Sequence, residues 1–91
     1  ALPNWMGVLF FLNLGQLVTS KKGRDSGRMY VVVGFCDQGY VQVADGVVRT
    51  RKRPKRKNIK HLVVHKVNLG SETFQDRDIR EFIKMHSFTG I

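Results

Sequence analysis

Residues 29–44, MYVVVGFCDQGYVQVA, predict two β-strands joined by a tight turn. β-Branched and aromatic side chains dominate the first strand, Met29–Cys36, and Gly34 within it indicates a bulge or a bend. The turn is Asp37–Gly39, where the glycine suits the left-handed position of a three-residue hairpin loop. The stretch therefore predicts an antiparallel hairpin.

The returning strand, Tyr40–Ala44, indicates which face is buried. Val41 and Val43 alternate with the other three residues, so both valines should point into the core. Tyr40 stands beside the turn and could stack on an unpaired base, although aromatic residues in small strands more often belong to the core.

Further strands are predicted on both sides of this hairpin. Leu17–Thr19 is β-prone, Val47–Thr50 follows an Asp-Gly turn as a third meander strand, and Ile59–Val67 could close the sheet against the first strand. Four to five short strands separated by glycine-containing turns predict a mainly β fold, a small SH3-like barrel.

The C-terminal stretch changes to helical spacing. Ile79, Phe82 and Ile83 predict one amphipathic helix over about residues 74–86, with Thr73 and Asp76 forming a capping box at its start. We expect this helix to cover an open end of the barrel.

A chain of 91 residues has room for one domain. We divide it into an apolar N-terminal extension (1–13), the barrel (14–70) and the helical segment (71–91). Trp5, Phe10 and Phe11 should pack on the barrel or a partner. The apolar start is too short to cross a bilayer and lacks the features of a signal peptide. Because Cys36 is the single cysteine, no internal disulfide can form, which favours a reduced, cytoplasmic setting.

The charge is concentrated in the middle of the chain. The net charge is +9, and residues 14–70 carry 13 basic and 3 acidic side chains. Eight of the twelve residues in Arg49–Lys60 are Lys or Arg, and none is acidic. We expect this run to form an extended, mobile loop that becomes ordered on binding phosphates. Its alternative roles are a localisation signal or a solvated charged loop.

A second basic loop precedes the hairpin. Residues 21–28 hold four basic residues around Gly23 and Gly27, which would let backbone N–H groups approach phosphate oxygens. An ordinary solvated turn is the alternative interpretation of this loop.

The stretch containing this loop, residues 14–33 (LGQLVTSKKGRDSGRMYVVV), resembles the KOW motif of ribosomal proteins and transcription elongation factors. The chain is also similar, through Asp37–Gln38, Val41–Gly46 and Asn58–Leu62, to the archaeal and eukaryotic large-subunit ribosomal proteins of the KOW class and their short bacterial relatives. The similarity covers about residues 14–66. It implies an SH3-like barrel that binds RNA, with Gly15, Gly23 and Gly27 as motif glycines and Gly27 as the invariant one.

These observations together predict an RNA-binding protein that contacts ribosomal RNA and associates with the ribosome or translation. The predicted RNA-binding residues are Lys21, Lys22, Arg24, Arg28, Arg49, Arg51, Lys52, Arg53, Lys55, Arg56, Lys57, Lys60 and His61. The alternative is an SH3-like protein-interaction module in transcription or translation, whose charge serves localisation or solubility.

Catalytic and metal sites are not predicted. The seven carboxylates are scattered, and no Ser, His and Asp grouping or phosphate-binding loop of the nucleotide-hydrolase kind is present. His61, His65 and Cys36 supply three zinc ligands at best, where four are usual. We therefore predict no enzyme activity, cofactor, small-molecule substrate or membrane partner.

Overall fold

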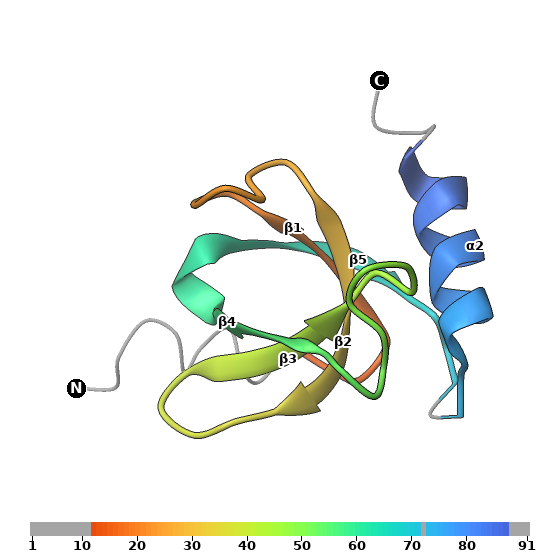
Figure 1. Ribbon diagram of the computed structural model, residues 1–91, viewed down its shortest axis with the longest axis horizontal. Coiled ribbons are helices and arrows are strands. Elements are labelled where there is room, and N and C mark those ends of the chain that lie inside the picture. The colour runs from red at the N-terminus through yellow and green to blue at the C-terminus, as the bar shows by residue number, and fades with distance from the viewer. Residues whose placement is uncertain (1–11, 72, 88–91) are drawn as a thin grey trace.

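The computed structural model describes residues 12–71 and 73–87, which form one sheet of five antiparallel strands and one C-terminal helix (Figure 1). In chain order the elements are β1 Gln16–Ser20, β2 Met29–Phe35, β3 Tyr40–Ala44, β4 Lys55–Asn58, the 3-10 turn η1 Ile59–His61, β5 Leu62–Asn68 and α2 Asp76–Ser87. The predicted mainly β fold with a C-terminal helix is confirmed.

The strands are hydrogen-bonded in the order β4-β3-β2-β1-β5. The segment after the basic run does not pair with the predicted first strand, Met29–Cys36. It forms β5 and pairs with β1, with Val18 opposite Val64. The pairing of β2 with β3 shifts register between Val32 and Gly34, so the predicted bulge is confirmed. The sheet curls but remains open, because β4 and β5 are its two edges, and a closed barrel is not seen in the described part of the chain.

The curled sheet is buried on both faces. Its inner face holds a cluster of Leu12, Val18, Tyr30, Val32, Val41, Val43, Ile59 and Leu62. Its outer face holds Leu17, Val31 and Ala44, which pack with Phe74 and Ile79. Val41 and Val43 are fully buried in the inner cluster, as their alternation predicts.

Helix α2 lies against the outer face of the sheet (Figure 1). The expectation that it covers an open end of a barrel is therefore wrong. Its position follows from Leu17, Val31 and Ala44, whose apolar surface would otherwise face water, and Ile79 is fully buried over them.

The start of α2 also differs from the prediction. The helix begins at Asp76, and the Asp78 carboxylate accepts a hydrogen bond from the backbone N–H of Gln75 at 2.8 Å. The contact from an acidic side chain back to the backbone N–H three residues earlier is therefore made by Asp78 and Gln75, two residues after the predicted pair Asp76 and Thr73. Asp76 Oδ1 instead accepts the backbone N–H of Arg51 at 2.9 Å, which links the helix to the basic run.

The predicted strand Val47–Thr50 is an irregular loop. The Asp45 side chain accepts the backbone N–H groups of both Val47 and Arg49 at 2.9 Å, which replaces strand pairing by a local turn. Val47 and Val48 are consequently 68% and 67% exposed. The fourth strand begins only at Lys55, inside the basic run.

The expectation that Trp5, Phe10 and Phe11 pack on the barrel or a partner lies outside the described residues. Leu12, at the end of the predicted extension, is buried in the inner cluster. No described helix has the length and apolar character needed to span a membrane.

Candidate nucleic-acid interface

The loop of residues 21–28 leaves β1 and returns as β2. Its glycines Gly23 and Gly27 both have φ of +90°, and Gly15 before β1 has +85°. Gly27 donates its backbone N–H to the Ser20 carbonyl at 2.7 Å, and Ser20 donates to the Arg28 carbonyl at 2.9 Å. A side chain at Gly27 would be strained in this left-handed backbone, so glycine suits the position that closes the loop.

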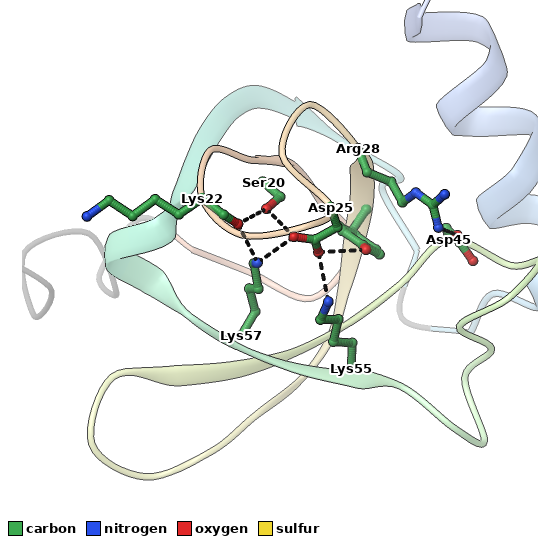
Figure 2. A network of polar contacts seen from close by, with 8 residues as sticks. Ser20, Lys22, Asp25, Arg28, Asp45, Lys55 and Lys57 are labelled. Atoms are coloured by element: carbon green, nitrogen blue, oxygen red, sulfur yellow. Dashed lines mark hydrogen bonds and ion pairs between the residues drawn. The ribbon is translucent and has the colours of Figure 1, made fainter.

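Asp25 is the centre of the polar network beneath this loop (Figure 2). Its side chain is only 8% exposed. The carboxylate accepts Ser20 Oγ at 2.9 Å, Tyr30 Oη at 2.8 Å, Lys55 Nζ at 3.0 Å and Lys57 Nζ at 2.8 Å. A single buried acid thus joins the first basic loop to β4.

The same contacts set the protonation state of Asp25. Burial by itself raises the pKa of the carboxyl, but hydrogen bonds from Lys57, Tyr30, Lys55 and Ser20 outweigh it and hold the pKa far below its ordinary value of 3.8. Burial and the neighbouring Asp25 raise the pKa of Tyr30 to about 12. Asp25 is therefore an anion and Tyr30 a neutral donor near neutral pH.

Two of the predicted RNA-binding lysines belong to this network. Lys57 is 8% exposed, and its Nζ also donates to the Lys22 carbonyl at 3.1 Å. Lys55 is partly exposed, but its Nζ is paired with Asp25. We therefore assign both lysines to the attachment of β4, and no phosphate contact to their ammonium groups.

Asp25 is not among the site residues predicted from the sequence. The available signal was that Asp25 is the one acidic residue between residues 14 and 36, inside a basic loop. A lone carboxylate among cations is a candidate for an internal ion pair. Its partners Lys55 and Lys57 are 30 and 32 residues further along the chain, so they could not be identified from local spacing.

The first part of the basic run is attached to α2. Arg51 donates its guanidinium to the Phe74 carbonyl and lies over the Phe74 ring, 5.0 Å from the centroid. Arg80 Nη1 donates to the Gly46 carbonyl at 2.8 Å. A Cβ at Gly46 would lie 2.4 Å from the Asp76 carbonyl oxygen, so glycine permits this close approach. The expectation of one extended loop over Arg49–Lys60 is wrong. Arg51 near its start contacts the helical segment, and Lys55–Asn58 form strand β4.

The remaining predicted cations point into solvent. Within residues 12–71 and 73–87, no side-chain hydrogen bond or ion pair is formed by the group that we call the exposed cations: Lys21, Lys22, Arg24, Arg49, Lys52, Arg53 and Lys60. Arg28 is exposed, with its guanidinium 4.0 Å from the Asp45 carboxylate. Arg56 is exposed and lies over the Tyr40 ring.

The histidines have structural contacts. The His61 carbonyl accepts the backbone N–H of Lys21 at 2.9 Å, which places η1 and Lys60 beside the first basic loop. His65 Nε2 lies 2.6 Å from Thr19 Oγ1. No group of three metal-ligand side chains gathers in the described part of the chain.

Two regions distant in sequence therefore meet at one rim: residues 21–28, and β4 with the η1 turn that follows it. The Asp25 contacts and the Lys21–His61 hydrogen bond hold them together. No protein-family model and no curated protein matches this chain.

Proposed function

We propose that this protein binds structured RNA, ribosomal RNA in the first place, through the exposed cations and in association with the ribosome or translation in the cytoplasm. The observation that carries the proposal is the Asp25 network, which joins β4 to the first basic loop. Four of the exposed cations, Lys21, Lys22, Arg24 and Lys60, are thereby presented by one folded rim, and the other three, Arg49, Lys52 and Arg53, lie on the loop that leads into β4.

The charge balance at the rim supports an anionic partner. Asp25 faces two lysine ammonium groups at 3.0 and 2.8 Å, so its negative charge is compensated inside the protein. The exposed cations have no such compensation from the described residues. Phosphate groups would neutralise them and release condensed counterions.

The side chains at the rim favour recognition of the RNA phosphate backbone rather than of base edges. Lysine and arginine dominate the rim, and the deep major groove of an RNA helix hides its base edges from side chains. We therefore expect the protein to recognise the path of phosphates along a folded RNA.

The salt dependence of binding tests this function. Fluorescence anisotropy with a labelled ribosomal RNA stem-loop, measured from about 50 to 500 mM KCl, should show the logarithm of the association constant falling linearly with the logarithm of salt concentration. Each phosphate contact contributes a slope of roughly −0.7 to −0.9, so four contacts give about −3. A flat dependence would contradict the proposal and favour apolar docking by a protein-interaction module.

A further inference from the structure

Part of the outer sheet face is left open beside α2. The helix packs over the region of Leu17, Val31 and Ala44. Further along β3, on the same face as Ala44, lie Tyr40 and Gln42. Gln42 is directly opposite Arg56 on β4, and both side chains are exposed.

On this open face the Arg56 guanidinium lies over the Tyr40 ring. The guanidinium carbon of Arg56 lies 4.1 Å from the centroid of the Tyr40 ring, close enough for a cation–π contact. Its neighbours Lys55 and Lys57 point to the opposite side of β4 and are held by Asp25. Arg56 is exposed, so the side of its planar group away from Tyr40 is accessible.

Gln42 adds hydrogen-bonding capacity to the same surface. A Cβ at Gly34, the residue paired with Gln42 on β2, would lie 2.5 Å from Gln42 Oε1, so the amide rests against the sheet where glycine leaves room. Among the described residues the Gln42 side chain has no hydrogen-bond partner. Its amide therefore keeps both donor and acceptor groups.

We propose that Tyr40, Gln42 and Arg56 form a binding site for one unpaired nucleobase of RNA. The base stacks on the exposed side of the Arg56 guanidinium, which Tyr40 supports from below, and the Gln42 amide bonds its edge. Guanidinium planes and aromatic rings are the groups on which proteins stack unpaired bases. The inference rests on the proposed RNA binding and adds to it a preference for RNA with a bulged or looped-out nucleotide.

The test compares two RNAs that differ by one nucleotide: a fully paired stem-loop and the same stem-loop with a single bulged adenosine. The wild-type protein should bind the bulged RNA about tenfold more tightly. Arg56→Lys keeps the charge but removes the planar group, and Tyr40→Leu removes the ring. Both variants should bind the two RNAs with nearly equal affinity. Arg77→Lys makes the same exchange at an exposed position on α2, outside the proposed RNA-binding residues, and should keep the preference.

A second measurement on the wild type is independent of the variants. In NMR spectra the δ-methylene protons of Arg56 should move upfield when the bulged RNA is added, because a stacked base shields them, and should stay in place with the paired RNA. Equal affinity of the wild type for both RNAs, or a tenfold preference kept by Arg56→Lys, would overturn the base site while leaving RNA binding intact. Absence of binding to either RNA at low salt would contradict the proposed function itself.

Discussion

Replacing Asp25 by alanine is expected to lower the free energy of unfolding by about 3–5 kcal/mol, a large part of the roughly 5–15 kcal/mol typical of a domain. The substitution removes the anion that pairs with Lys55 and Lys57 and accepts the Tyr30 hydroxyl. Lys57 is 8% exposed, so its charge would remain largely buried without a partner. Urea unfolding followed by circular dichroism measures the change.

Asp37→Ala is the matched control for Asp25→Ala. Asp37 is an exposed carboxylate in the β2–β3 turn, and its side chain makes no hydrogen bond or ion pair within residues 12–71 and 73–87. Its loss should change the free energy of unfolding by no more than about 0.5 kcal/mol. If Asp25→Ala and Asp37→Ala had equal effects, the Asp25 network would not stabilise the fold as we argue.

The pH dependence of stability provides a further test of Asp25. Because the pKa of Asp25 in the folded state is held below its ordinary value of 3.8, the folded protein favours the ionised carboxylate. The resulting stabilisation is complete above the unfolded pKa and is lost as pH falls through that value towards the folded one. The melting temperature should therefore decline steeply below about pH 4, and the decline should be shallower in Asp25→Asn.

The second large effect is expected on RNA affinity. Replacing Arg49, Lys52 and Arg53 together by alanine should weaken binding to a ribosomal RNA stem-loop about 100-fold near 0.15 M salt. The salt slope should become shallower by about 2 to 3, because three phosphate contacts are lost. All three side chains are exposed and make no ion pair among the described residues, so the fold should be retained.

The control for this variant removes the same charge elsewhere. Lys66, Arg77 and Lys84 are exposed residues on β5 and α2, and their replacement by alanine also lowers the net charge from +9 to +6. Binding should weaken by less than about fivefold, since only the long-range attraction changes. An equal loss in both triple variants would mean that affinity follows net charge and that the exposed cations form no particular site.

Several elements were predictable because their patterns are local. The alternation of Val41 and Val43 and the helical spacing of Ile79 and Phe82 each report burial within one element. The bulge at Gly34 was predicted from a single glycine inside a strand. The strand expected at Val47–Thr50 fails for a physical reason. Asp45 binds the backbone N–H groups of the following loop, and this local turn replaces strand pairing despite two β-branched residues.

The position of α2 depended on packing between elements. Its apolar residues are evident in the sequence, but their partners Leu17, Val31 and Ala44 come from three strands. The combined apolar surface exists only once the sheet has formed, so the choice between an open end and the outer face could not be made from the helix alone.

The hairpin, the terminal helix and the stretches that carry positive charge could be predicted from local sequence patterns, but the pairing of β5 with β1 could not. Which cations are free to contact phosphate depends on how the chain folds. Lys55 and Lys57 lie in the densest basic run, yet both form ion pairs with Asp25. Arg56 between them is exposed and lies over the Tyr40 ring. The periodicity of hydrophobic residues can be recognised from neighbours in the sequence. Whether a charged side chain is paired depends on which distant groups the fold brings within a few ångströms of it.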